Sequence, residues 1–259
     1  MNQLLEGKTY VIMGVANKRS IAWGIARSLH AAGARLIFTY QGERLQKNVQ
    51  ELADTLDRDD SLLFPCDVTK DEEIEQAFNS IKEEVGVIHG VAHCIAFAKT
   101  EELQGEFVQT SREGYHLAQD ISSFSLVAVA KAAKDLMTEG GSIVTMTYLG
   151  GERVVPNYNV MGVAKAALDA NVKYLANDLG KYNIRVNSIS AGPIRTLAAK
   201  GVKGFNAIFK TIEEKAPLRR TVSQEEVGDT ALYLFSDLSR GVTGECIHVD
   251  AGFNIMGLI

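Results

Sequence analysis

The sequence predicts an α/β fold in which one domain is built on a doubly wound sheet of seven parallel strands. Three observations support this prediction. Segments typical of strands and of helices alternate along the whole chain. The predicted strands are nearly continuous apolar runs, which is typical of parallel strands covered by helices on both faces. No repeat and no linker of different composition interrupts the pattern, so we expect residues 1–259 to form a single domain.

Seven short apolar segments are the predicted strands. They span Lys8–Gly14, Arg35–Tyr40, Ser61–Cys66, Val87–Ala96, Ser142–Thr147, Arg185–Ser190 and Cys246–Val249. The helices between them are indicated by apolar residues at helical intervals. We place them at Ser20–His30, around Leu45–Leu56, around Ile74–Val85, at Ser111–Met137, from about Asn157 to Lys181, and at Gln224–Phe235. A Rossmann-type sheet of this kind binds its ligand beyond the carboxyl ends of the strands.

The composition is that of a soluble enzyme. Of the 259 residues, 46% are hydrophobic and 23% are charged, and the net charge of −5 argues against nucleic-acid binding. We find no signal peptide and no run of 18 apolar residues, so we expect a cytoplasmic protein without a membrane span. Cys66, Cys94 and Cys246 are far apart and are expected to be reduced. The histidines and cysteines show no metal-binding spacing, so no metal site is expected.

The segment after the first strand is a candidate site for a pyrophosphate. Gly14, Ala16 and Ser20 supply small residues just before a predicted helix, whose first amides can bind phosphate oxygens. The glycine spacing differs from the G-x-G-x-x-G fingerprint. Taken alone, this segment is therefore equally compatible with an ordinary loop between a strand and a helix.

Three further strand ends carry residues that suit a dinucleotide. Gln41 follows the second strand, where a carboxylate normally holds the adenosine ribose, and its amide can still bind a hydroxyl. Neither Tyr40 nor Gln41 is basic, which favours NADH over NADPH, although Arg44 is close. Asp67 follows the third strand and could accept a hydrogen bond from the adenine amino group, unless it only caps a helix. Ile95–Ala98 closes the fourth strand with residues that suit a flat ring.

A polar pair follows the fifth strand. Tyr158 and Lys165 are seven residues apart, so a helix that begins near Asn157 would project both side chains from one face, about 10 Å apart along its axis. A phenol and an ammonium placed in this way can handle protons, and the cation is expected to lower the pKa of the tyrosine. Taken alone, the spacing would favour a packed tyrosine and a solvated lysine.

Together these residues resemble the short-chain dehydrogenase/reductase superfamily and, more narrowly, the bacterial NADH-dependent enoyl-[acyl-carrier-protein] reductases. The resemblance covers essentially the whole chain. It is carried by Gly14-x5-Ser20-Ile21-Ala22-Trp23-Gly24, Cys66-Asp67-Val68, Tyr148-x9-Tyr158-x6-Lys165 and Ser190-Ala-Gly-Pro-Ile-Arg-Thr196. Most members of the superfamily have the tyrosine four residues before the lysine, where this chain has Met161. The enoyl reductases have the wider spacing found here.

The resemblance implies a role for each matching residue. Those expected to contact the dinucleotide are Gly14, Ser20, Ile21, Gln41, Asp67, Val68, Ile95, Lys165, Ile194 and Thr196. Tyr158 would contact the thioester carbonyl of the substrate, and Ala98 would line the same pocket. Tyr148 is a secondary catalytic and substrate-binding candidate, or only a packed aromatic residue. Hydride addition to a conjugated thioester moves negative charge to the carbonyl oxygen, where a phenol hydroxyl stabilises the enolate. The resemblance also implies a homotetramer.

Residues 195–220 are expected to form a mobile substrate-binding lid. They contain seven basic and two acidic residues, a local net charge of +5 in a chain of −5. Apolar residues are interleaved with these charges, and two glycines could act as hinges. These residues are Leu197, Phe205, Ile208, Phe209 and Ile212, with Gly201 and Gly204. We expect the apolar residues to cover an acyl chain and lysines such as Lys200 and Lys203 to meet an acidic carrier protein. The alternative is a solvated helix face.

The function that we expect is reduction of the trans-2 double bond of enoyl-[acyl-carrier-protein] by NADH in fatty acid biosynthesis. Two other functions are compatible with the fold. A carbonyl or hydroxyl dehydrogenase would need a tyrosine one turn before Lys165, and Met161 argues against it. A non-catalytic dinucleotide sensor could keep the Gly14 loop, but it would have no use for Tyr158 and Lys165.

Overall fold

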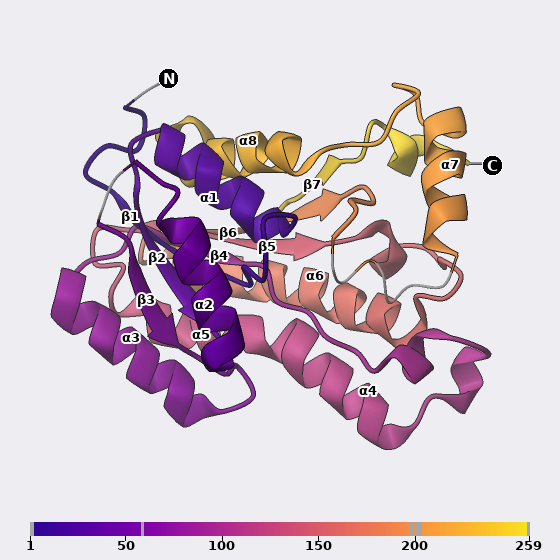
Figure 1. Cartoon of the computed structure of the whole chain (residues 1–259), viewed down its shortest axis with the longest axis horizontal. Helices are drawn as coiled ribbons and strands as arrows, with labels where there is room; N and C mark the ends of the chain where they lie inside the picture. The colour runs from indigo at the N-terminus through magenta and orange to yellow at the C-terminus, as the bar shows by residue number, and fades with distance from the viewer. Residues whose placement is uncertain (1–2, 58–59, 197–198, 200–203, 258–259) are drawn as a thin grey trace.

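The computed structural model of the protein describes residues 3–57, 60–196, 199 and 204–257. Its strands are β1 (Thr9–Met13), β2 (Arg35–Tyr40), β3 (Leu62–Pro65), β4 (Gly90–His93), β5 (Gly141–Thr147), β6 (Ile184–Ala191) and β7 (Cys246–Val249). They form one sheet in the order β3-β2-β1-β4-β5-β6-β7, and all neighbouring strands are parallel (Figure 1). The predicted doubly wound α/β fold with seven parallel strands is confirmed.

Helices cover both faces of this sheet (Figure 1). They are α1 (Ile21–Ala31), α2 (Gly42–Ala53), α3 (Asp71–Val85), α4 (Arg112–Gln119), α5 (Ser125–Lys134), α6 (Asn159–Gly180), α7 (Phe205–Lys215) and α8 (Gln224–Phe235). Apolar residues of α1, α2 and α8 form one core cluster with the sheet, and those of α3, α5 and α6 form another. In the described ranges, no helix has the length and apolar character that crossing a membrane requires.

Strand β1 explains why the predicted strands are nearly continuous apolar runs. Tyr10 and Ile12 enter the core cluster of α1, α2 and α8, whereas Val11 and Met13 enter that of α3, α5 and α6. All four side chains are fully buried. Because helices cover both faces of the strand, every position is apolar rather than every second one. The Tyr10 hydroxyl is the polar exception, and it donates to the main-chain oxygen of Phe235 at 3.3 Å.

Two predicted elements differ most from the structure. The strand expected at Val87–Ala96 is shorter, because β4 pairs with β1 only as far as His93, where β1 reaches its own last residue. The helix expected at Ser111–Met137 is divided into α4 and α5 by a π-helical turn at Asp120–Phe124. Within this turn, the Ser122 hydroxyl bonds the main chain of Phe97 and ties the turn to the segment after β4.

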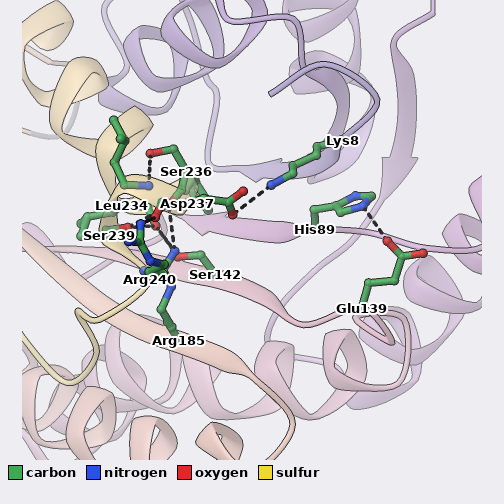
Figure 2. Close-up of polar contacts among 12 residues, drawn as sticks. Lys8, His89, Glu139, Ser142, Arg185, Leu234, Ser236, Asp237, Ser239 and Arg240 are labelled. Carbon is green, nitrogen blue, oxygen red and sulfur yellow. Dashed lines mark hydrogen bonds and ion pairs between the residues drawn. The ribbon is translucent and has the colours of Figure 1, made fainter. Parts of the chain in front are cut away.

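Polar contacts hold the edge of the sheet at the amino ends of the strands (Figure 2). Arg185 at the start of β6 donates to the main-chain oxygen of Leu234 at 2.7 Å, and Ser142 at the start of β5 donates to the same oxygen at 2.8 Å. These bonds satisfy a carbonyl in the last turn of α8, which has no partner inside its own helix. Lys8 pairs with Asp237 at 3.2 Å just beyond that helix. The contacts attach α8 to the sheet at the end opposite to the predicted site.

Candidate active site

The residues predicted to bind cofactor and substrate lie beyond the carboxyl ends of the strands. Gly14, Ser20 and Ile21 follow β1, Gln41 follows β2, Asp67 and Val68 follow β3, Ile95 and Ala98 follow β4, Tyr148 follows β5, and Ile194 and Thr196 follow β6. Tyr158 and Lys165 come from the start of α6, which packs beside β5 and β6. The strand order reverses between β1 and β4, and sheets of this kind bind ligands at such a reversal.

The turn after β1 has room for glycine only. Gly14 has a φ of 93°, and a Cβ at this position would lie 2.1 Å from the main-chain oxygen of Cys94. The Ser20 hydroxyl then accepts from the main-chain nitrogens of Ala16 at 3.0 Å and of Asn17 at 3.2 Å, just before α1 begins at Ile21. Ser20 therefore holds the loop in shape, and the loop leads into a helix amino terminus that favours an anion.

Gln41 and Asp67 meet at the ends of β2 and β3. The Gln41 amide donates to Oδ2 of Asp67 at 2.8 Å, and Thr69 donates to Oδ1 from its main-chain nitrogen at 3.0 Å and its hydroxyl at 2.8 Å. Partial burial raises the pKa of Asp67, but the bonds from Thr69 and Gln41 lower it more, so the pKa lies below its ordinary value. Since α3 begins only at Asp71, Asp67 is not its N-cap, and this alternative from the sequence is wrong.

The helix of Tyr158 and Lys165 begins at Asn159, close to the predicted start near Asn157. Asn157 and Asn159 have φ values of 61° and 26°, in the left-handed region that asparagine tolerates better than most residues. Tyr158 is consequently the N-cap residue of α6, and Asn159 donates to the main-chain oxygen of Gly105 at 3.1 Å. Two unusual backbone positions therefore determine where the Tyr158 side chain leaves the chain.

The ring of Tyr158 packs against the turn that follows β5. A Cβ at Gly150 would lie 2.4 Å from a ring carbon of Tyr158, so this turn also needs glycine. The rings of Tyr148 and Tyr158 are 5.0 Å apart and meet edge to face at 71°. Burial, together with the charge of Asp250, raises the pKa of Tyr148 to about 12. Tyr148 also lines a small cavity with Ser190, Gly192 and Asp250.

Lys165 is buried beneath the same turn. Its side chain is 5% exposed, and Nζ donates to the main-chain oxygen of Met146 at 2.7 Å. Burial lowers the pKa of Lys165 to about 8, against the opposing charge of Asp169. The lysine is therefore mainly protonated at neutral pH, and the bond to Met146 uses one of its three N–H groups. The alternative of a solvated lysine is wrong.

The expected lowering of the Tyr158 pKa is also wrong. Burial raises this pKa above its ordinary value, and Tyr148 and Asp169 raise it further. The sequence indicated a cation near the phenol, but it did not show that packing around Tyr158 outweighs that charge. Tyr158 is therefore a neutral phenol, which donates a hydrogen bond rather than accepting a proton.

Met161 and Ala98 belong to an apolar cluster beside Tyr158. Met161 occupies the position of the tyrosine found in most short-chain dehydrogenases, and here it is 7% exposed. It packs in one cluster with Leu103 and Val160, and both Ala98 and Tyr158 border this cluster. The structure thus brings two residues predicted to bind substrate, Ala98 and Tyr158, to one apolar surface.

The segment after β6 leads to α7, which stands beyond the carboxyl ends of the strands (Figure 1). Ile194 borders a cluster that contains Ile212 of α7, so a predicted cofactor residue meets the predicted lid. The Thr196 hydroxyl accepts from the main-chain nitrogen of Ala199 at 3.1 Å. Arg195 lies over the ring of Phe209 at 4.2 Å. Leu197, Lys200, Gly201 and Lys203, which belong to the predicted lid, lie outside the described residues.

One basic residue of the lid segment forms an ion pair outside the lid. Arg220 donates to both carboxylate oxygens of Glu226, at 2.9 and 2.7 Å. Glu226 belongs to the capping box of α8 together with Ser223. Part of the positive charge noted in the sequence therefore stabilises the start of α8 rather than facing a partner.

Sequence reasoning did not single out Asp169, which follows Lys165 by one helical turn. Its Oδ2 accepts from the Thr147 hydroxyl at 3.1 Å, and its Oδ1 is buried with no hydrogen-bond partner in the described part of the chain. Burial raises the pKa of Asp169, whereas Thr147 and Lys165 lower it. The signal in the sequence was an acidic residue at i+4 from the lysine, a spacing that places both on one helix face.

Cys246, His248 and Glu152 also lie together, with one potential ligand atom of each within 4.8 Å of the others. His248 Nε2 bonds Glu152 Oε1 at 2.7 Å, so these two side chains are each other's hydrogen-bond partners without a metal ion. The expectation that the protein has no metal site stays a prediction. Cys66, Cys94 and Cys246 are free thiols, as expected.

A doubly wound parallel sheet, with a glycine turn after β1 and a partly buried tyrosine beside a buried lysine beyond β5, defines the class of dinucleotide-dependent oxidoreductases. Within this class, the family model described as Enoyl-(Acyl carrier protein) reductase matches residues 14–254. The chain therefore belongs to this family, and the resemblance seen in the sequence is confirmed.

Individual relatives agree with this assignment over nearly their full length. The NADH-dependent enoyl-[acyl-carrier-protein] reductase of Bacillus subtilis is 74% identical over 255 residues, which cover 98% of this chain and 99% of the relative. The NADPH-dependent enzyme of Staphylococcus aureus is 64% identical over 250 residues, covering 96% and 98%. The crystal structure of the Bacillus cereus enzyme with NADP+ and an indole naphthyridinone has a TM-score of 0.98 at 72% identity, covering 99% of this chain and 100% of that one.

Proposed function

We propose that the protein reduces the trans-2 double bond of enoyl-[acyl-carrier-protein] with NADH, as a step of fatty acid biosynthesis. The observation that carries this proposal is the arrangement of Tyr158 and Lys165 beyond β5, next to the apolar cluster of Met161 and Ala98. A carbonyl dehydrogenase of the same fold would place a hydroxyl where Met161 stands. Met161 is buried in that cluster and has no proton to donate.

The described residues fit a dinucleotide along the carboxyl edge of the sheet. We expect the pyrophosphate to lie beside the glycine turn after β1, at the amino terminus of α1, and Asp67 to offer a carboxylate acceptor at the adenine end. We expect Ile95 and Val68 to contact the dinucleotide with their apolar side chains. Lys165 supplies donors for the nicotinamide ribose. Gln41 is neutral and already bonds Asp67, so it offers no charge to a 2′-phosphate, which supports NADH over NADPH.

The chemistry then follows from where charge develops. NADH, when bound, supplies a hydride to the β-carbon of the conjugated thioester, and the electrons of the double bond move toward the carbonyl oxygen. The neutral Tyr158 hydroxyl donates a hydrogen bond to that oxygen and stabilises the enolate. A proton from solvent then adds to the α-carbon, and the electrons of the enolate restore the thioester carbonyl. We assign Tyr148 a secondary role, in which its ring holds that of Tyr158 by the contact at 5.0 Å.

Residues 195–220 act in this proposal as a mobile lid over the acyl chain. The support is that Ile208 and Ile212 of α7 turn their apolar side chains toward Ile194 and Val222, which follow β6 and precede α8. Lys210, whose side chain is 76% exposed, remains available to the acidic surface of a carrier protein despite a loose pairing with Glu214 at 3.8 Å. We further propose a cytoplasmic homotetramer.

An assay of NADH consumption tests the proposed function. We expect oxidation of NADH with a trans-2-enoyl thioester and none with ketones or without an acceptor. Oxidation with a ketone alone would favour a carbonyl reductase, and binding of NADH without turnover of either acceptor would favour a sensor. A parallel titration with NADPH measures the cofactor preference, which we expect to favour NADH.

A further inference from the structure

Two successive residues of β5 bind two charged residues of α6. Met146 accepts from Nζ of Lys165 at 2.7 Å, and Thr147 donates from its hydroxyl to Oδ2 of Asp169 at 3.1 Å. Lys165 and Asp169 are four residues apart, so they lie on one face of α6, one turn from each other. The end of β5 therefore binds both an ammonium and a carboxylate from one face of α6.

Asp169 has more acceptor capacity than its neighbours use. The Thr147 bond engages Oδ2, whereas Oδ1 is buried without a hydrogen-bond partner in the described part of the chain. A buried carboxylate oxygen in this state is costly unless an opposite charge lies near. Lys165 is such a charge, and its bond to Met146 leaves two N–H groups for other acceptors.

We propose that Asp169 is a positioning residue that keeps Lys165 protonated and aligned for the cofactor. The inference rests on the proposed role of Lys165 in binding the nicotinamide ribose. Asp169 itself would touch neither cofactor nor substrate. It acts through Lys165, while Thr147 fixes the direction of its carboxylate.

Among the groups around Lys165, Asp169 is the one whose charge keeps the amine protonated. Burial lowers the pKa of Lys165 to about 8, and the charge of Asp169 is the strongest opposing influence. His93, the last residue of β4, and Cys94 after it also lie within electrostatic range of the amine. Burial lowers the pKa of His93 to about 3 and raises that of Cys94 to about 12, so both are neutral near pH 7. Tyr158, from the start of α6, is a neutral phenol as well.

Two further charges act on Asp169 rather than on the amine. Glu152, in the turn after β5, raises the pKa of Asp169, and Lys173, one turn further along α6, lowers it. Glu152 is bound to His248 at 2.7 Å. Because these two effects are opposite, we treat Asp169 as an anion that raises the pKa of Lys165.

A purely structural role for Asp169 is the alternative, in which the Thr147 bond only fastens α6 to β5. The two roles separate under substitution. Asp169→Asn removes the charge but can still accept a bond from Thr147. Thr147→Val removes that bond but retains the charge. A structural role predicts the larger effect from Thr147→Val, and the proposed role predicts it from Asp169→Asn.

The experiment is a titration of NADH against the wild-type protein and these variants from about pH 6 to about pH 10, followed by the fluorescence of the bound dinucleotide. The affinity for NADH falls at high pH, and we expect Asp169→Asn to lower the pH at which it falls by about one unit. At about pH 8 its affinity falls roughly fivefold or more, while at about pH 6 it stays within about twofold. Asp169→Glu restores the wild-type profile, and Thr147→Val shifts it little.

A profile of Asp169→Asn that superimposes on the wild type would overturn the inference, as would an equal shift in Thr147→Val. Asp169→Ser provides a second neutral variant should the amide fail to fold. Lys165→Met separates this inference from the proposed function. If that variant binds NADH like the wild type, the assigned role of Lys165 fails, whereas an effect of Lys165→Met without one of Asp169→Asn removes only the role of Asp169.

Discussion

Lys165 and Met146 are joined by a hydrogen bond of 2.7 Å from Nζ to the main-chain oxygen, which anchors the amine of α6 at the carboxyl end of β5. The anchor keeps a 5%-exposed amine in one position, at the cost of removing a charge from water. The bond to Met146 thus positions the ammonium, whereas burial of its charge destabilises the fold. Two predictions follow from this opposition, one for cofactor binding and one for stability.

Replacement of Lys165 by methionine should weaken NADH binding. Hydrogen bonds from a charged group contribute about 1.5–3 kcal/mol, so we expect the Kd to rise roughly tenfold to a hundredfold. In the wild type the affinity should fall as the pH rises through about 8, where Lys165 loses its proton. Fluorescence titration across this range measures both effects. A variant that retains the wild-type pH dependence would show that another group is responsible for it.

The same substitution should stabilise the protein at neutral pH. The pKa of Lys165 is lowered from 10.5 to about 8 in the folded state, so the unfolded chain binds the proton more tightly. The destabilisation is therefore complete below about pH 8 and is relieved as the pH rises toward 10.5. We expect Lys165→Met to raise the free energy of unfolding by about 1–3 kcal/mol at pH 7. Urea denaturation at pH 7 and near pH 10 should give a smaller difference at the higher pH.

Gly14→Ala should damage both the fold and the cofactor site. The new Cβ would lie 2.1 Å from the main-chain oxygen of Cys94, at a φ of 93°. We expect a loss of about 3 kcal/mol in the free energy of unfolding and at least about tenfold weaker NADH binding. Gly86→Ala is the matched control, since Gly86 also has a positive φ, of 72°, but no atom lies within 4 Å of its Cβ position. Equal losses in the two variants would mean that the close approach to Cys94 is unimportant.

Arg185→Leu should lower stability without changing the chemistry. Arg185 donates to the main-chain oxygen of Leu234 (Figure 2) and to that of Val242. Both bonds lie at the amino edge of the sheet, opposite to the predicted site. We expect a loss of about 2–3 kcal/mol in the free energy of unfolding, because buried carbonyls lose charged donors. The KM for NADH should be unchanged. Arg240→Leu, which removes an exposed arginine from the same edge, should cost much less. A changed KM in Arg185→Leu would contradict the separation of the two edges.

The order of the sheet elements could be predicted because the physical signals are local. Apolar runs such as Tyr10–Met13 reveal strands that are buried on both faces. Parallel connections then bring their carboxyl ends to one edge, which is why Gly14, Asp67 and Tyr148 could be assigned to a common site. The spacing of Tyr158 and Lys165 placed both near β5, and their helix begins within two residues of the predicted start.

Other features depend on tertiary contacts that the sequence pattern does not contain. Asn157 and Asn159 adopt left-handed conformations, so α6 begins at Asn159 with Tyr158 as its N-cap residue. Burial outweighs the nearby cation in setting the pKa of Tyr158. The bond between Asp169 and Thr147 joins residues 22 positions apart, and only the packing of α6 on β5 reveals it.

Single-turnover oxidation of NADH by a trans-2-enoyl thioester, compared between the wild type and Tyr158→Phe, tests the central claim most directly. Phenylalanine keeps the ring contacts with Tyr148 and Gly150 and removes only the hydroxyl. We predict that the rate of hydride transfer falls about 100-fold or more, because one donor to the developing oxyanion is lost. The Kd for NADH should stay within about twofold. An unchanged rate of hydride transfer in Tyr158→Phe would contradict the account.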